Sequence, residues 1–155
     1  MNTLQALREN VLWEFDGNEK DFEANIIENL DQIIELLGLP EIKAVGRQKQ
    51  IRFHGGQIII DIVIRHIDGS ATIIEVKKLN KKNKWVSPFA QMQAIGQLLL
   101  YQNIFEAKTN VKPRLILIDN KIHERTCLAF MNNNLPITLI DFQKDRIFVP
   151  YNALT

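Results

Sequence analysis

The sequence predicts an α/β fold in which one central mixed sheet carries helices on both of its faces. Three observations support this prediction. Apolar residues recur at helical spacing over residues 20–38, three apolar segments separated by turn sequences follow over residues 43–79, and "RLILID" at 114–119 is a continuous apolar run. A continuous run of this kind is typical of a strand buried on both faces of a parallel sheet. We therefore expect an antiparallel meander joined to a parallel strand.

The first half of the chain predicts two helices and three strands. A helix over residues 20–38 ends at Gly38 and Pro40, and a weaker amphipathic helix covers residues 2–14. Strands are expected at about 43–53, 57–66 and 71–79, because "HGG" (54–56) and "DGS" (68–70) supply the residues of tight turns between them. These three strands form the predicted meander.

The second half begins with a polar, lysine-rich loop, "NKKNKWVSP", which a long helix follows at about 88–107. The strand at 114–119, a short helix at about 121–132 and a last strand at "ITLIDF" complete the α/β pattern. No internal repeat or linker interrupts it.

Length and composition indicate one domain spanning residues 1–155. The chain is 46% hydrophobic and 24% charged with a formal net charge of +1, so any anionic partner must be bound by a local cluster of cations. The single Cys127, expected in the core, fits a reducing compartment. Because neither a signal peptide nor a membrane-spanning segment is apparent, we expect a cytoplasmic protein with no membrane partner, and a phage or mobile element is one source that would fit.

Three charged residues stand in segments that otherwise exclude water. Asp61 lies within "QIIIDIVIRH", where an isolated carboxylate would cost several kcal/mol. Glu75 and Lys77 lie two residues apart in "ATIIEVKK", so their side chains project to the same face of a strand. Two interpretations remain open at this point: a buried ion-pair network, or two carboxylates that bind a hard divalent cation beside a lysine.

Asp61, Glu75 and Lys77 together resemble the signature of the PD-(D/E)xK nuclease superfamily, with Ile60 in place of the usual proline. The resemblance covers most of residues 20–107. "FEANIIENLDQIIELLGL" resembles the opening helix of NucS-type endonuclease domains, "GGQIIIDIVI" with "DGSATIIEVKK" resembles their catalytic hairpin, and "AIGQLLLY" is similar to the Gln-x-x-x-Tyr helix of NucS-like and RecB-like nucleases.

The resemblance implies a restriction-endonuclease-like core and a set of site residues. Asp61, Glu75 and the backbone carbonyl of Val76 would bind Mg²⁺, which Mn²⁺ can replace, and Lys77 would be the catalytic lysine. Glu23 would be the further acidic residue of the first helix, with Glu28 as an alternative. The other implied site residues, on the later helix, are Gln97, Tyr101 and Gln93.

Basic residues near these acids are candidates for binding a phosphate backbone. The loop after the third strand provides Lys78, Lys81, Lys82, Lys84 and Trp85. The first strand provides a second basic edge, with Arg47, Lys49 and Arg52, and His54 stands in the turn that follows. For any single lysine of the loop, an ordinary solvated residue that aids solubility is the better interpretation.

The residues and the resemblance together predict an Mg²⁺-dependent DNA endonuclease that acts as a homodimer or higher homo-oligomer. The resemblance implies an enzyme of the homing or restriction type. The alternatives are a nuclease-fold module that binds DNA without cutting it, and a structure-specific junction or repair nuclease. The segment from Lys108 onward lies outside the resemblance and is a candidate for a subunit interface or for base readout.

Overall fold

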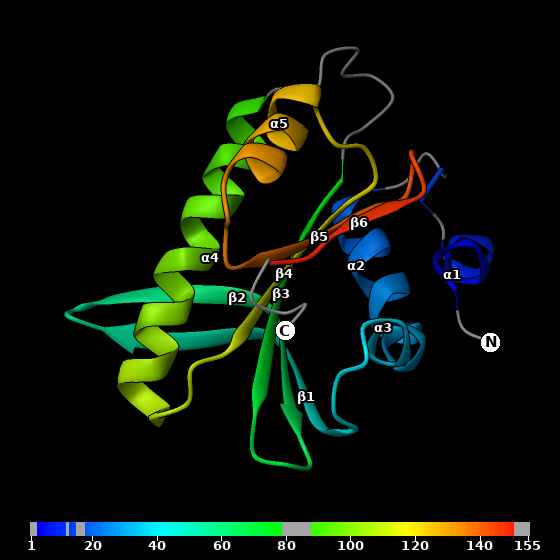
Figure 1. Cartoon of the computed structure of the whole chain (residues 1–155). Helices are drawn as coiled ribbons and strands as arrows, with labels where there is room; N and C mark the ends of the chain where they lie inside the picture. The colour runs from blue at the N-terminus through cyan, green and yellow to red at the C-terminus, as the bar shows by residue number, and fades with distance from the viewer. Residues whose placement is uncertain (1–2, 12, 15–17, 79–87, 151–155) are drawn as a thin grey trace.

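The computed structural model describes residues 3–11, 13–14, 18–78 and 88–150. Three helices precede the sheet: α1 (Leu4–Asn10), α2 (Glu19–Glu28) and α3 (Leu30–Leu36). The strands are β1 (Ile42–Phe53), β2 (Gly56–His66), β3 (Ala71–Lys77), β4 (Arg114–Asp119), β5 (Ile137–Asp141) and β6 (Arg146–Phe148). Helix α4 (Pro88–Thr109) connects β3 to β4, and α5 (Glu124–Asn132) connects β4 to β5 (Figure 1).

The described strands form a single six-stranded sheet in the order β1-β2-β3-β4-β5-β6. Strands β1, β2 and β3 are the antiparallel meander that the turn sequences predict. Strand β4 pairs in parallel with both β3 and β5, and β6 returns antiparallel to β5. The prediction of a mixed sheet with a meander and a parallel section is confirmed.

Helices cover both faces of this sheet, as predicted. The helices α1, α2 and α3 pack on one face, in a core that contains Phe22, Ile74 and Phe142. The helices α4 and α5 pack on the other face, in a core that contains Leu98, Ile73 and Leu117. Cys127 is 1% exposed and belongs to this second core, as expected.

The helix predicted over residues 20–38 is in fact two helices separated by Asn29. The backbone of Asn29 leaves the helical region (φ −109°, ψ 16°), and its side-chain amide donates to the carbonyl of Asn25 at 2.8 Å. Such local hydrogen bonds let Asn compete with the helical backbone, and apolar periodicity does not reveal them. The break lets α2 and α3 lie differently on the sheet while both bury apolar residues.

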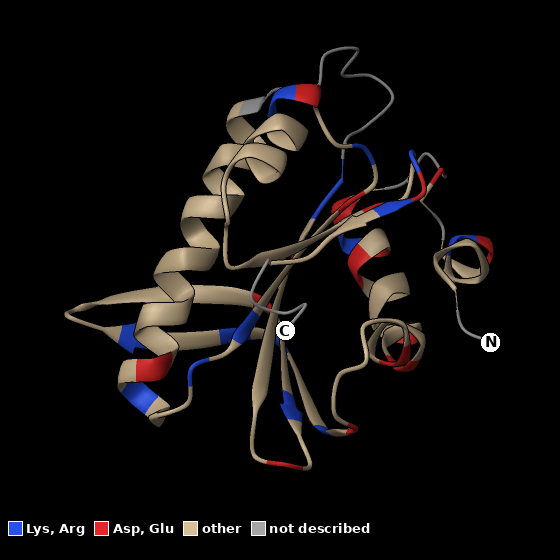
Figure 2. Cartoon of the chain, in the orientation of Figure 1, with Lys and Arg blue, Asp and Glu red and all other residues tan. Residues whose placement is uncertain are grey.

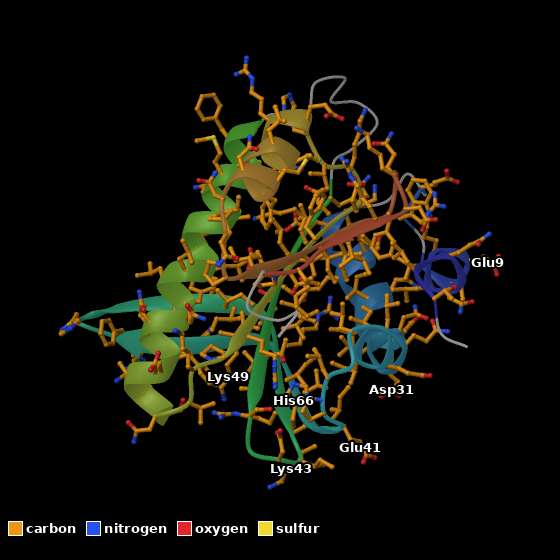
Figure 3. The ribbon with its side chains drawn as sticks, in the orientation of Figure 1. Glu9, Asp31, Glu41, Lys43, Lys49 and His66 are labelled. Atoms are coloured by element: carbon orange, nitrogen blue, oxygen red, sulfur yellow. The ribbon has the colours of Figure 1, made fainter. Side chains whose placement is uncertain are left out.

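His66 is a structural residue in the interior near the end of β2 (labelled in Figure 3). Its Nδ1 lies 2.6 Å from the carbonyl oxygen of Pro40, and its Nε2 lies 2.7 Å from Oγ1 of Thr72. The ring thereby joins the chain entering β1 to β3. Among the described helices, none is long and apolar enough to cross a membrane.

Candidate functional site

The candidate site lies where strands β2 and β3 separate. Their ladder ends at the pair Ile62–Ile74, although β2 continues to pair with β1 and β3 continues to pair with β4. Figure 1 shows the far half of the β1–β2 hairpin turned away from β3. At this fork the backbone N–H of Val76 donates to Oδ2 of Asp61 at 3.0 Å. The carboxylate of Asp61 thus takes the place of the next backbone acceptor.

Glu75 and Lys77 meet Asp61 at this fork. Both project to the face of the sheet that α4 covers, because they alternate with Ile74 and Val76 of the opposite core. Nζ of Lys77 lies 3.5 Å from Oε1 of Glu75. Glu75 is only 4% exposed, and its Oε2 is buried without a hydrogen-bond partner. A buried carboxylate oxygen without a donor is costly, so it indicates a place for a cation or for a ligand that donates.

The electrostatics of the pair favour an added positive charge. Burial, and then the negative charge of Asp61, raise the pKa of Glu75 to about 8, although Lys77 opposes this shift. Burial also raises the pKa of Asp61, with a further contribution from Glu23, while hydrogen bonds from Val76 and Gln48 act in the opposite direction. Two carboxyl groups this close disfavour joint ionisation, which a divalent cation would relieve.

Glu23 reaches the site from α2 on the other side of the sheet. It is 3% exposed, and its Oε1 accepts from Nε of Arg47 at 2.9 Å. The alternative acid, Glu28, is exposed at the end of α2. Of the two helix acids that the resemblance offered, the structure therefore brings only Glu23 to the fork.

Gln48 joins Glu23 to Asp61 and was not predicted from the sequence. Its Nε2 lies 3.2 Å and 3.1 Å from the two carboxylate oxygens of Glu23, and 3.2 Å from Oδ1 of Asp61. Gln48 stands between the strand pairs Arg47–Ile62 and Lys49–Ile60, with a left-handed backbone (φ 52°). This conformation costs a non-glycine residue about 1–3 kcal/mol and recurs at functional sites. A glutamine carries no sequence signal for it.

Glu19 is a second site residue that sequence reasoning missed. The backbone amide of Lys78 hydrogen-bonds to its carboxyl group, and the charges of Lys77, Asp61 and Glu23 all act on it. Burial is the largest cause of its raised pKa. The signal was present in the sequence, since Glu19 precedes Glu23 by four residues and so shares its helix face.

Of the three residues predicted on helix α4, Tyr101 lies close enough to the acids to be affected by their charge. Tyr101 is 7% exposed, and burial followed by the charges of Glu75 and Asp61 raises its pKa to about 12. Oε1 of Gln97 is buried without a hydrogen-bond partner. Gln93, one turn earlier, is exposed to solvent.

Asp119 ends β4 beside this site, opposite Lys77 in the parallel ladder. It is 4% exposed, and burial raises its pKa to about 7. Nε2 of Gln91, on α4, donates to Oδ2 of Asp119 at 2.9 Å, and the N–H of Lys121 donates to Oδ1 at 3.2 Å. The sequence predicted only a strand here. Asp119 lies beside the site because β4 pairs with β3, which is distant from it in the sequence.

The predicted DNA-binding residues are placed in part. Lys49 (labelled in Figure 3) and Arg52 are exposed on β1. Arg47 is also exposed, although it pairs with Glu23. Lys78 directly follows β3. The other residues predicted for this role lie outside the described part of the chain: Lys81, Lys82, Lys84 and Trp85.

The donor groups at the fork fit a magnesium ion. Among the described residues, no three His, Cys, Asp or Glu side chains are grouped closely enough to hold a metal by themselves. Mg²⁺ usually uses one or two carboxylates, keeps several waters and takes further oxygens from substrate phosphates. Asp61 and Glu75 supply two carboxylates, and Oε2 of Glu75 is an available oxygen.

The sheet order, the helices on both faces and the acids at the fork define a restriction-endonuclease-like α/β domain. Comparison with solved structures finds the same fold in a repair endonuclease from Pyrococcus abyssi (TM-score 0.51, 19% identity, covering 83% of this chain and 48% of that one). It also finds Can2 from Sulfobacillus thermosulfidooxidans in complex with cyclic tetra-adenylate (TM-score 0.54, 16% identity, 80% and 30%). A third match is the protein VC1899 from Vibrio cholerae (TM-score 0.53, 12% identity, 79% and 30%).

The chain therefore has the fold of the PD-(D/E)xK nucleases, as the sequence resemblance implied. It spans about half of the Pyrococcus structure and about a third of the other two. Comparison of the sequence with protein-family models and with curated proteins finds no match.

Proposed function

We propose that this protein is a divalent-metal-dependent DNA endonuclease that hydrolyses phosphodiester bonds. The observation that carries the proposal is the meeting of Asp61, Glu75 and Lys77 at the β2–β3 fork, with Oε2 of Glu75 buried and without a partner. A purely structural ion-pair network would be expected to satisfy that oxygen. The fold, shared with a solved repair endonuclease, is compatible with this chemistry.

Each residue at the fork has a proposed role. Asp61, Glu75 and the carbonyl of Val76 would hold Mg²⁺ or Mn²⁺, a cation that lowers the pKa of bound water and neutralises charge on a phosphodiester. Lys77 keeps 28% of its side chain exposed, so its ammonium can reach both Glu75 and a phosphate oxygen. Glu23 and Glu19 add negative charge on the α2 side, and Gln97 and Tyr101 supply polar groups from α4.

The DNA backbone would approach along the β1–β2 hairpin. Lys49 and Arg52 are exposed on β1, on the hairpin that turns away from β3 at the fork. Lys78 follows the strand that carries Glu75 and Lys77. Such cations bind phosphates without reading bases, so they would position a duplex rather than select a sequence.

Site-specific cleavage by a homo-oligomer, of the homing or restriction type, is our preferred form of this function. Two active sites are needed to cut both strands of a duplex, and a two-fold dimer is the simplest way to supply them. A structure-specific junction or repair nuclease is the second candidate, and the similarity to a repair endonuclease favours it. A module that binds DNA without cutting is disfavoured because Asp61, Glu75 and Lys77 are all present and grouped.

Incubation with plasmid DNA tests the proposal. We expect nicking or linearisation of the plasmid in Mg²⁺ or Mn²⁺ and none in EDTA. A parallel reaction with branched DNA substrates separates the two nuclease candidates, because a structure-specific nuclease would cleave these in preference to the plasmid. Binding without cleavage of any substrate in either metal would favour the non-cutting module. If the protein neither binds nor cleaves any of these DNA substrates, the proposal as a whole is contradicted.

Gln48 provides a second prediction about the same site. Gln48→Gly removes the amide that bridges Glu23 and Asp61, and Gln48→Asn draws this amide back by one methylene group. Both substitutions keep a residue that tolerates the left-handed backbone. Since partners that orient metal ligands typically contribute 10–100-fold to affinity or activity, we expect Mn²⁺ to bind about 10–100-fold more weakly. The unfolding temperature should change little.

Free Mn²⁺ measured by electron paramagnetic resonance would report that affinity without any cleavage assay. Gln50→Gly, which removes an exposed amide two residues further along β1, is the matched control. Equal Mn²⁺ affinity in wild type and Gln48→Gly would show that the amide does not position the acids.

A further inference from the structure

Helix α4 exposes an apolar stripe along its outer side. Phe89 is 75% exposed, Met92 60% and Leu100 52%, which are high values for large apolar side chains. Gln93, Gly96 and Asn103 are exposed between and beyond them. At 3.6 residues per turn these positions lie within about 60° of one line on the helix. We call these six residues the outer stripe of α4.

The opposite side of the same helix is fully used. Ala94, Leu98 and Phe105 are buried against the sheet in the second core. The helix is therefore apolar on two sides, although only one of them is covered by described residues. Large apolar side chains that gather on an exposed surface mark a site of protein contact. The outer stripe thus lacks a partner within the described part of the chain.

The outer stripe also lies on a helix without charge. From Pro88 to Phe105 the sequence contains no Asp, Glu, Lys or Arg, whereas 24% of the whole chain is charged. Figure 2 shows this as a helix of almost uniform colour, with charged residues only at its C-terminal end. An ordinary solvent-facing helix surface would carry charged residues instead.

We propose that the outer stripe of α4 is the contact surface for a second copy of this chain. In a two-fold contact each residue near the axis faces its own counterpart, so any charge there would meet a like charge. A neutral apolar surface avoids this repulsion, whereas a surface for a different protein can use opposite charges for selectivity. This inference rests on the homo-oligomer of the proposed function and names the surface through which that oligomer forms.

The geometry of the stripe suits an antiparallel crossing at Gly96. A side chain built at this glycine would meet nothing within 4 Å, so a partner helix can approach closely there. Phe89 and Asn103 lie seven residues to either side of Gly96, about 10 Å along the axis. A two-fold axis at Gly96 would place the ring of Phe89 against the partner's Asn103, and Met92 against the partner's Leu100.

Helix α5 also exposes large apolar side chains. Leu128 is 51% exposed and Met131 63% exposed on α5, which lies beside α4 in Figure 1. Stable interfaces cover roughly 800 Å² on each partner, more than one helix face provides. Leu128 and Met131 are therefore candidates for the rest of the contact.

Two variants of exposed residues test the surface. Leu100→Glu places a carboxylate against the apolar side chain of the partner's Met92, where its burial would be costly, and we expect the dimer dissociation constant to rise at least ~100-fold. Ile67→Glu is the matched control, because Ile67 is 60% exposed on the turn between β2 and β3. Masses from light scattering across a concentration series, with circular dichroism to check folding, give the readout.

A cysteine crosslink tests the crossing point directly. Gly96→Cys should form an intermolecular disulfide rapidly under mild oxidation, whereas Asp31→Cys, on α3 across the sheet (Figure 3), should not. The native Cys127 is buried and does not compete.

A wild-type protein that stays monomeric at high concentration would overturn the inference. So would a dimer that Leu100→Glu leaves intact, or a stripe that binds another protein and not its own copy. A monomer that cleaves DNA would refute the surface and leave the nuclease proposal standing. A dimer that fails to cleave would do the reverse.

Discussion

Asp61→Asn should reduce DNA cleavage on the order of 1,000-fold while leaving the fold intact. Removing one of two carboxylates from a cation that stabilises developing charge costs several kcal/mol of transition-state energy, and ~4 kcal/mol corresponds to this factor. The asparagine still offers an oxygen to the N–H of Val76, which Asp61 accepts at 3.0 Å. Lys77→Ala should lower the rate comparably, because it removes the ammonium beside Glu75.

Single-turnover cleavage of plasmid DNA measures both effects, and thermal unfolding checks the fold. Glu35→Gln is the matched control, since Glu35 is an exposed acid on α3. Wild-type rates in Asp61→Asn, with Glu35→Gln also at the wild-type rate, would remove Asp61 from the chemistry. A nuclease active without Asp61 would need a different centre.

The metal-free protein should lose stability as the pH rises from 5 to 8. A carboxyl group whose pKa is raised in the folded state binds its proton more tightly there than in the unfolded chain. The stabilisation that this proton binding gives the folded state is fully present below the unfolded pKa, which is 4.5 for Glu75. It is lost as the pH approaches the folded pKa of about 8. Asp119 acts in the same direction, from 3.8 up to about 7. Because raising a pKa by one corresponds to ~1.4 kcal/mol, the combined loss of folding free energy is several kcal/mol.

Glu75→Gln should flatten the upper part of this dependence and raise the free energy of unfolding at pH 8.5 by about 2 kcal/mol or more, since it removes a poorly compensated buried charge. Urea unfolding in EDTA between pH 5 and pH 9 is the measurement. Asp119→Asn is the control, because its effect should appear mainly below pH 7. Parallel curves for wild type and Glu75→Gln above pH 7 would show that this carboxyl group does not titrate there.

Most of the fold follows from patterns that are local in the sequence. The turns at 54–56 and 68–70 lie between strands that pair as predicted, and the apolar run at 114–119 is a central parallel strand. Three features were not predicted: the break at Asn29, the parallel pairing of β4 with β5, and the short edge strand β6. Side-chain hydrogen bonds and pairing partners decide these features, and apolar periodicity reports neither.

The site divides in the same way. Asp61, Glu75 and Lys77 were visible because charge stood out within apolar strands, and the structure brings them together. Gln48 and Asp119 were invisible because one depends on an unusual backbone angle and the other on a distant strand pairing. Neither property is written in a short motif.

The hydrogen bond from Val76 to Asp61 has a consequence for how mutations at the fork should be interpreted. Asp61, the proposed metal ligand, also has a structural role, since it accepts a hydrogen bond from β3 at the point where the β1–β2 hairpin separates from that strand. Asp61→Ala would therefore have two effects: it would remove a proposed metal ligand, and it would remove the hydrogen bond that connects the β1–β2 hairpin to β3. Asp61→Asn separates the two effects, because it keeps the acceptor for the N–H of Val76 and removes only the charge.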